Sequence, residues 1–303
     1  MKQINLGNSG LMASEIVLGC MRINKFSVDE VKDLINTAVE CGIDFFDHAD
    51  IYGGGKSEEL FGDALTPALR DKIKIQTKCS IRKGFYDFSK EHILSSVDAS
   101  LKRLKTDYVD TLLLHRPDTL MEPEEVAEAF NELYKSGKVK SFGVSNHNPM
   151  QIELLQKYTE HKLIINQLQL SITNTGMIDS GINVNTKFPG AIDRDGSVLE
   201  YSRLKDITIQ AWSPFQYGFF EGVFLNNDKF PELNKVLDRI SAEKNISTSA
   251  LAVAWILRHP AKIQTIVGTT NKDRLKDICT ASDVSLTREE WYEIYRAAGN
   301  ELP

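Results

Sequence analysis

Four side chains that can take part in proton transfer follow three consecutive apolar segments of the chain. The side chains are Asp47, Tyr52, Lys78 and His115, and the segments span 42–46, 73–77 and 108–114. If each segment is a strand of one parallel barrel, the carboxyl ends of the strands bring the four side chains to a single rim, which is where such barrels place catalysis. An acid, a phenol, an ammonium and an imidazole at one rim are suited to giving a proton to a carbonyl oxygen. The sequence therefore predicts a site for acid–base chemistry on a carbonyl compound.

Within this quartet each side chain supplies something that another needs. A tyrosine, with an ordinary pKa of about 10, is a weak acid at neutral pH unless a cation stabilises its anion, and Lys78 is placed to do so. A buried ammonium needs a counter-ion in turn, which Asp47 offers. His115 can donate a hydrogen bond to the substrate oxygen. We therefore expect Tyr52 to be a general acid whose pKa is lowered by Lys78, whereas His48 is expected to be a packed, hydrogen-bonded histidine outside the chemistry.

Strand and helix patterns alternate along almost the whole chain. Eight strands are predicted, near residues 16, 43, 73, 108, 139, 163, 207 and 263. The helical patterns between them imply right-handed crossovers and a parallel sheet, and the first helix opens with the capping box Ser27–Glu30. Eight such units in 303 residues fit a closed (β/α)8 TIM barrel, an α/β fold, better than an open sheet. No linker divides the chain, so residues 1–303 are expected to form a single domain.

An N-terminal hairpin and two long loops are expected in addition to the barrel units. Gln3–Leu6 and Glu15–Leu18 flank the turn-rich Gly7–Gly10, which predicts a β-hairpin ahead of the barrel. Thr173–Arg194 and Phe215–Pro231 are poorly periodic and follow the sixth and seventh predicted strands. Long loops in compact domains are usually functional, so these two are expected to shape the substrate pocket.

The composition is that of an ordinary globular protein, with 42% hydrophobic and 26% charged residues. A net charge of -6 and the lack of a dense basic run argue against a nucleic-acid partner. No apolar run is long enough to span a membrane, and the first residues lack the apolar core of a signal peptide. The 4 cysteines are scattered without a Cys-x-x-Cys pair, which fits reduced thiols in a cytoplasm. These properties leave the oligomeric state open.

The motifs that carry these residues resemble those of the aldo-keto reductase superfamily, and the resemblance covers almost all of the chain. Asp47–Gly53, Asp-His-Ala-Asp-Ile-Tyr-Gly, resembles the signature Asp-x-Ala-x-x-Tyr-Gly at the end of the second barrel strand. Lys78 and His115 match the catalytic lysine and histidine of that superfamily. The motifs Asp-His-Ala-Asp-Ile-Tyr-Gly and His-Arg-Pro-Asp are similar to those of a bacterial subgroup of predicted oxidoreductases. The resemblance implies reduction of aldehyde or ketone carbonyls to alcohols with NADPH.

The resemblance also implies where the nicotinamide of NADP(H) binds. Gly143–Asn146 resembles the strand-five motif whose Ser145 and Asn146 hold the carboxamide, and Gln167 is at the strand-six position that joins them. Trp212–Phe215 resembles a motif that is usually Tyr-Ser-Pro-Leu, with Trp212 stacking on the nicotinamide ring. Further implied cofactor contacts are Gly19, Met21, Asp47, Ser213, Phe215, Gly268, Thr269, Thr270 and Arg274.

The segment after the eighth predicted strand is expected to bind the phosphate end of the cofactor. Gly268 and the hydroxyls of Thr269 and Thr270 precede a predicted helix, whose N-terminus favours anions. The resemblance implies that Arg274 contacts the adenosine 2′-phosphate, and its planar guanidinium suits that group. Gly268 stands where relatives commonly have a lysine, so one protein contact to the phosphate of NADPH is missing, and with it one source of preference over NADH. A Gly-x-Gly-x-x-Gly fingerprint is absent, as fits a barrel that binds nicotinamide without a Rossmann domain.

Two other functions would use the same residues. A Schiff-base aldolase would use Lys78 as its nucleophile, although the residues expected to hold nicotinamide have no role in that reaction. A cofactor-binding sensor or regulatory barrel would keep the quartet and turn over slowly. A metal-dependent hydrolase is disfavoured because no His-x-His pair ends a predicted strand. The carbonyl substrate itself is not named by the sequence, since the pocket depends on the two long loops.

Overall fold

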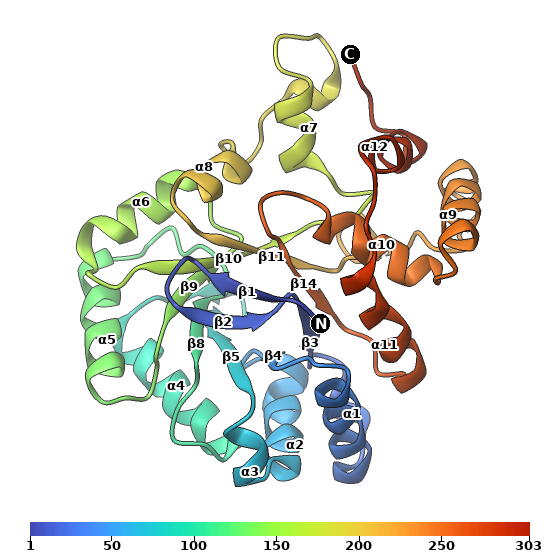
Figure 1. The fold of residues 1–303 in the computed structure, drawn as a ribbon. Helices are drawn as coiled ribbons and strands as arrows, with labels where there is room; N and C mark the ends of the chain where they lie inside the picture. Colours follow the sequence, from blue (N-terminus) through green and yellow to red (C-terminus); the bar gives the residue numbers. More distant parts are fainter.

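Eight parallel strands close into a barrel in the computed structural model, which describes residues 1–303 (Figure 1). Each strand pairs with its neighbours in chain order, and the last pairs with the first to complete the ring. The predicted (β/α)8 TIM barrel is therefore confirmed. The barrel strands are β3 (Ile16–Gly19), β4 (Phe45–Asp47), β5 (Lys74–Cys79), β8 (Thr111–Leu114), β9 (Phe142–Ser145), β10 (Leu163–Gln169), β11 (Thr208–Trp212) and β14 (Gln264–Val267).

A small hairpin of β1 (Gln3–Leu6) and β2 (Leu11–Ser14) lies across the amino end of the barrel (Figure 1). Its buried residues Leu6 and Ala13 pack in one cluster with side chains of the barrel strands, among them Phe45. The hairpin is where the sequence predicts it, but its second strand is not Glu15–Leu18. Those residues lie mostly in β3, because their fully buried apolar run suits a barrel strand better than a hairpin with one solvent-facing side.

Helices cover the barrel from outside, and their apolar faces bury against the strands (Figure 1). Side-chain caps fix where several of them begin, since Ser27, Asn148 and Thr287 each form a capping box with the residue three positions on. None of the helices combines the length and the apolar composition that a membrane crossing requires. The helices of the ring are α1 (Val28–Glu40), α2 (Lys56–Ala64), α4 (Lys90–Leu104), α5 (Pro123–Lys135), α6 (Pro149–Tyr158), α8 (Val198–Leu204), α10 (Thr248–Leu257) and α11 (Lys272–Cys279).

The two long segments expected to be loops contain short elements of their own. Thr173–Arg194 holds α7 (Gly176–Ile182), and Phe215–Pro231 holds a hairpin of β12 (Gln216–Tyr217) and β13 (Gly222–Val223). Beyond them lie the outer helices α9 (Pro231–Lys244) and α12 (Arg288–Ala297). The β12–β13 hairpin presents the exposed aromatic side chains of Phe219 and Phe220 at its turn.

Candidate active site

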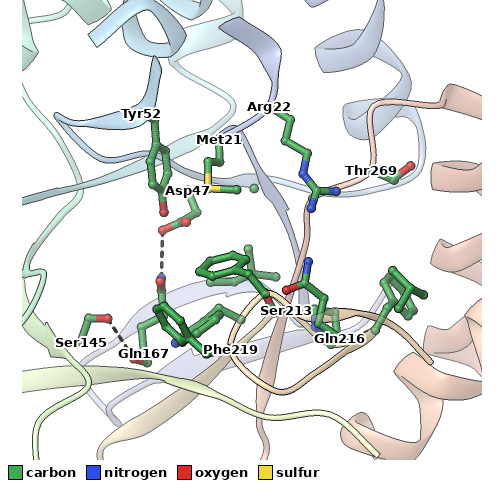
Figure 2. Close-up of a pocket in the computed structure, with 18 of the residues that line it drawn as sticks. Met21, Arg22, Asp47, Tyr52, Ser145, Gln167, Ser213, Gln216, Phe219 and Thr269 are labelled. Carbon is green, nitrogen blue, oxygen red and sulfur yellow. Dashed lines mark hydrogen bonds between the residues drawn. The ribbon is translucent and has the colours of Figure 1, made fainter. Parts of the chain in front are cut away.

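A cavity of about 860 Å³ opens at the carboxyl ends of the barrel strands (Figure 2). Asp47 ends β4, Ser145 ends β9, Gln167 lies in β10 and Trp212 ends β11, and all four line the cavity. Its volume falls in the range of roughly 300–1,000 Å³ that small-molecule and cofactor sites occupy. The rim at which the sequence predicts a functional site is thus the rim that contains this cavity.

Lys78 lies directly beneath this cavity with its ammonium group completely enclosed. Its Nζ donates to Asp47 Oδ2 at 2.8 Å, to the backbone oxygen of His48 at 2.7 Å and to the Tyr52 hydroxyl at 3.1 Å. All three N–H donors of the ammonium are therefore used. Burial by itself lowers the pKa of Lys78, but Asp47 and Tyr52 raise it, and the net direction is upward. Lys78 is consequently a protonated, enclosed cation and lacks the free amine that a Schiff-base nucleophile needs.

The Tyr52 hydroxyl is oriented by this contact. Because its oxygen accepts a hydrogen bond from Lys78, its own O–H is free to point into the cavity that the Tyr52 ring lines. Gly53 lets the chain turn here: its φ is +59°, and an added Cβ would come within 2.6 Å of Asn24 Cβ. The backbone therefore requires glycine directly after the tyrosine, as the Tyr-Gly motif has it.

The pKa of Tyr52 lies above its ordinary value, which corrects the expectation of a net lowering. Burial raises this pKa most, Lys78 lowers it as predicted, and Asp47 raises it again. The influence of the lysine thus has the expected sign but is outweighed by loss of water around the phenol. A fully protonated phenol in contact with a cation is still the form that a general acid must have before it donates.

Asp47 is held by Gln167, a predicted cofactor contact, and by Gln76, which the sequence analysis did not single out. Its Oδ1 accepts from Gln76 Nε2 at 2.6 Å and from Gln167 Nε2 at 3.0 Å. Both amides also donate to Gln210 Oε1, at 2.8 and 3.0 Å, and Gln210 donates to Gln264 Oε1 at 2.7 Å. The signal was a glutamine within each of four barrel strands, β5, β10, β11 and β14. These amides form a polar network inside the barrel that fixes the carboxylate facing Lys78.

His115 lies beside Tyr52 with its ring edge-on, at 6.1 Å between ring centroids and an interplanar angle of 82°. Burial lowers its pKa well below the ordinary value, and the positive charges of Lys78 and Arg116 lower it further. The imidazole is therefore neutral at physiological pH and can donate one hydrogen bond without being a competing acid. Of the quartet, only Tyr52 is left with a proton to give to a carbonyl oxygen.

His48 and Asp50 flank the quartet without reaching the cavity. The His48 ring is fully buried against Phe61, at 4.4 Å between centroids, and neither ring nitrogen has a hydrogen-bond partner. The expectation that it is packed holds, but the expected hydrogen bond is absent, and burial lowers its pKa to about 3. Asp50 also has a buried oxygen without a partner, and burial followed by the charge of Glu58 raises its pKa to about 7.

Ser145, Asn146 and Gln167 meet on the other side of the cavity. Asn146 Nδ2 donates to Ser145 Oγ at 2.8 Å. Ser145 Oγ donates in turn to the backbone oxygen of Gln167 at 3.0 Å (Figure 2). The second N–H of the Asn146 amide and Oε1 of Gln167 bind nothing in the protein. A free donor beside a free acceptor is the complement of a carboxamide, so these residues fit the amide of a nicotinamide.

Trp212 joins this group by donating from Nε1 to Asn146 Oδ1 at 3.2 Å. Its ring is also covered by the turn of the β12–β13 hairpin. Phe220 stacks on it with ring centroids 5.9 Å apart and an angle of 26°, and Phe219 meets it edge-on at 6.2 Å. The hairpin thus brings exposed aromatic rings to the indole on which the sequence resemblance places the nicotinamide.

Arg22, Gly268, Thr269 and Arg274 line the cavity away from Tyr52 (Figure 2, where Arg22 and Thr269 are labelled). Arg274 is exposed in the first turn of α11, whose cap Asn271 accepts from the Arg274 amide at 2.9 Å. An added Cβ on Gly268 would meet no atom within 4 Å, so the glycine leaves open space here. Two guanidinium groups and a hydroxyl at a helix N-terminus form a donor set that suits phosphate.

Most of the predicted site residues gather at this cavity. Lys78 is buried under it, and Thr270 alone among the predicted cofactor contacts does not line it. The lining residues that do so are Gly19, Met21, Asp47, Ser145, Asn146, Gln167, Trp212, Ser213, Phe215, Gly268, Thr269 and Arg274. The segment Phe215–Pro231, expected to shape the pocket, also contributes Gln216, Phe219, Phe220 and Asn226, whereas no lining residue comes from Thr173–Arg194. Wall residues that the sequence analysis did not assign include Ile51, Ile81, Tyr86, Arg116 and Thr248.

Comparison with known proteins decides what kind of barrel this is. The model of the Aldo/keto reductase family matches residues 15–298, which is nearly the whole chain. The protein belongs to the aldo/keto reductase family. The aldo/keto reductase resemblance of its motifs, including the similarity to bacterial oxidoreductases, is thereby confirmed.

Relatives of similar length support this assignment to the family. An uncharacterised oxidoreductase of Bacillus subtilis, YcsN, is 38% identical over 100% of both chains. A 6-dehydroglucose reductase of Agrobacterium fabrum is 37% identical, again over 100% of both chains. Among solved structures, a thermostable aldo-keto reductase in complex with the inhibitor epalrestat superimposes with a TM-score of 0.81 at 25% identity, covering 98% of this chain and 100% of that one.

Proposed function

We propose that this aldo/keto reductase transfers hydride from NADPH to the carbonyl carbon of an aldehyde or ketone, with Tyr52 as the general acid. The observation that carries the proposal is the Lys78–Tyr52 contact, in which the hydroxyl oxygen accepts from an enclosed ammonium at 3.1 Å. That contact directs the phenolic proton toward the cavity and stabilises the phenolate once the proton has left.

The residues around Tyr52 divide the remaining work. His115, kept neutral by its surroundings, donates a hydrogen bond to the carbonyl oxygen and so orients it toward the phenol. Asp47 holds Lys78 in place at 2.8 Å and keeps its charge under Tyr52. NADP(H) supplies the hydride when bound, while Ser145, Asn146, Gln167 and Trp212 would hold its nicotinamide end.

We also propose that NADPH is preferred over NADH. Arg274 and Arg22 place two guanidinium groups at the phosphate end of the cavity, and only NADPH carries a 2′-phosphate there for them to bind. A cytoplasmic location fits the four cysteines, all of which are free thiols. The substrate of this reaction is a small-molecule carbonyl compound. Sugar-derived aldehydes belong among the candidates because the Agrobacterium fabrum relative is a 6-dehydroglucose reductase.

The test is consumption of NADPH followed by absorbance against a panel of aldehydes, ketones and quinones. Repeated turnover with at least one carbonyl compound is the expected result. Oxidation of a single equivalent of tightly held NADPH, with no further turnover, would instead favour a sensor or regulatory barrel. Borohydride trapping of a carbonyl compound on Lys78 would support the Schiff-base aldolase function instead. The enclosure of that amine makes this result unexpected.

A further inference from the structure

The charges around the cavity leave one cation without a role. The charged lining residues are Arg22, Asp47, Arg116 and Arg274. Asp47 is neutralised by Lys78, whose Nζ lies 2.7 Å from Asp47 Oδ1, and the proposed function assigns Arg22 and Arg274 to the phosphate of the cofactor. Arg116 directly follows His115 in the chain, and its charge contributes to the low pKa of that imidazole, so it lies beside the reacting end of the cavity. The wall next to the carbonyl site therefore carries a net positive charge.

The Arg116 guanidinium has no hydrogen-bond or ion-pair partner in the protein. Only its backbone N–H is engaged, donating to Ser80 Oγ at 3.4 Å. The carboxylate nearest in sequence, Asp118, already accepts from the amides of Phe88 at 3.0 Å and Leu120 at 2.9 Å. Five N–H donors of a half-buried guanidinium are thus left for a ligand.

Other arginines of the protein that lie under the surface are paired. Arg70 donates to Asp110 at 2.9 Å, and Arg103 to Glu58 at 2.7 Å. Because leaving a partly desolvated cation unpaired is costly, an unpaired one in a cavity wall points to a partner that arrives with the ligand. Burial also lowers the pKa of Arg116, although guanidinium stays charged at any physiological pH.

Aromatic rings lie near the guanidinium. Its Cζ lies 5.6 Å from the ring centroid of Phe219 and 6.0 Å from that of Trp212. Contacts at these distances are within the roughly 6 Å reach of cation–π attraction and leave the N–H groups unused. Ile81 and Tyr86 add apolar surface to the same lining. The cavity that Tyr52 lines therefore combines apolar surface with an unpaired, planar cationic fork.

We propose that Arg116 selects carbonyl substrates that carry an anionic group, a carboxylate or a phosphate, a few bonds away from the reacting carbonyl. The fork would bind two oxygens of that group at once and thereby set the carbonyl against Tyr52 and His115. Because His115 and Arg116 are adjacent in the chain and line the same cavity, we expect the anion and the carbonyl to lie close together in the substrate. This inference rests on the proposed reductase function and narrows it to a class of substrate.

The experiment compares matched substrates that differ only in the anion, using NADPH and initial rates. One pair is 4-oxobutanoate and butanal, and the other is glyceraldehyde 3-phosphate and glyceraldehyde. We expect kcat/KM to favour the anionic member of one pair by roughly tenfold or more, since hydrogen bonds to charged groups have about that effect. The first pair reports on a carboxylate and the second on a phosphate.

Arg116→Met should bring the preferred ratio to within about threefold of unity. A urea unfolding midpoint close to that of the parent protein shows that the variant is folded. Arg239→Met is the matched control, because Arg239 pairs with Glu293 on the outer surface at 2.6 Å and its loss removes the same charge far from the cavity. That control should keep the preference of the parent protein.

Equal kcat/KM values within both pairs in the parent protein would overturn the assignment of Arg116. A preference for the anionic compound that survives Arg116→Met would also overturn it. The same holds if the parent protein reduces glyceraldehyde better than both anionic compounds, because the guanidinium would then bind neutral hydroxyl groups. If no member of either pair nor of the wider panel is reduced, the proposed function itself fails, and this result is distinct from the other three.

Discussion

Removing Lys78 should expose how the centre of the barrel is stabilised. Asp47 is only 3% exposed and Lys78 0%, so Lys78→Met leaves a carboxylate buried without its counter-ion. Breaking a buried pair in this way costs about 3–5 kcal/mol of unfolding free energy. The Gln76 and Gln167 amides still donate to Asp47 Oδ1, at 2.6 and 3.0 Å, so the lower end of that range is expected.

The double variant Asp47→Asn, Lys78→Met separates the charge from the lost hydrogen bonds. It has no unpaired carboxylate, and its remaining cost is the backbone oxygen of His48, which loses a donor at 2.7 Å. One unsatisfied buried acceptor costs about 1–3 kcal/mol. The double variant should therefore be more stable than the single one, although it departs further from the parent sequence.

Urea unfolding followed by tryptophan fluorescence measures both free energies, because Trp255 and Trp291 are buried in a stacked pair, 4.7 Å between centroids, that unfolding must separate. Lys56→Met is the control. Its partner Glu59 is 49% exposed, so its loss should change stability by less than about 1 kcal/mol. The reasoning is refuted if Lys78→Met costs no more than this control, or if adding Asp47→Asn destabilises the protein further.

Four other outcomes are expected. Tyr52→Phe should lower kcat/KM for carbonyl reduction by about 100-fold or more while leaving the Kd of NADPH within a few-fold, and residual activity above a tenth would exclude a general-acid role. Isothermal titration should show that Arg274→Ala narrows the preference for NADPH over NADH by roughly tenfold to a hundredfold, whereas equal affinities in the parent would remove the basis for this assignment. Binding of NADPH should quench tryptophan fluorescence, and Trp212→Tyr should abolish most of the quench yet keep activity, so an unchanged quench would place the nicotinamide elsewhere. The pKa of Asp50 is raised from 3.8 to about 7 in the folded state, so the unfolded chain releases this proton at lower pH and stability falls as pH rises from about 4 to 7. Asp50→Asn should therefore stabilise the protein more at pH 8 than at pH 4. Urea unfolding midpoints that shift equally at the two pH values would contradict this.

The barrel could be predicted from the sequence because its strands and helices follow strong local rules. The sequence predicts helices at 124–136, 149–157, 249–258 and 272–280, and α5, α6, α10 and α11 begin and end within one residue of these bounds, since caps and apolar periodicity agree there. The helix α2 was missed because it follows three glycines with left-handed φ, Gly53 to Gly55, which obscure its start. The hairpin partner was misplaced because Leu11–Ser14 is a weaker apolar segment than the strand that follows it.

The part of the candidate site that is formed by side chains at strand ends could be predicted from the sequence. The quartet comes together because parallel strands share one rim, and this requires no knowledge of loops. The phenol pKa was misjudged since its main determinant is burial, which depends on the surrounding three-dimensional packing. The rings of Phe219 and Phe220 over Trp212, and the unpaired Arg116, depend on the course of the β12–β13 hairpin, which has no periodic signal.

The glutamine network inside the barrel has a direction. The backbone oxygen of Ser14 can only accept, so the amide of Gln264 must present its N–H to it, at 2.7 Å, and its oxygen to Gln210. Gln210 must in turn present its oxygen to Gln76, which then has its N–H groups left for Asp47. Each amide is thus oriented by the one before it, in a row that begins at the β1–β2 hairpin and ends at the Asp47 carboxylate. Glutamate at position 264 could still accept from Gln210 but could not donate to Ser14, so the row would lose its link to the β1–β2 hairpin and a carboxylate would face the Ser14 carbonyl oxygen at the amino end of the barrel.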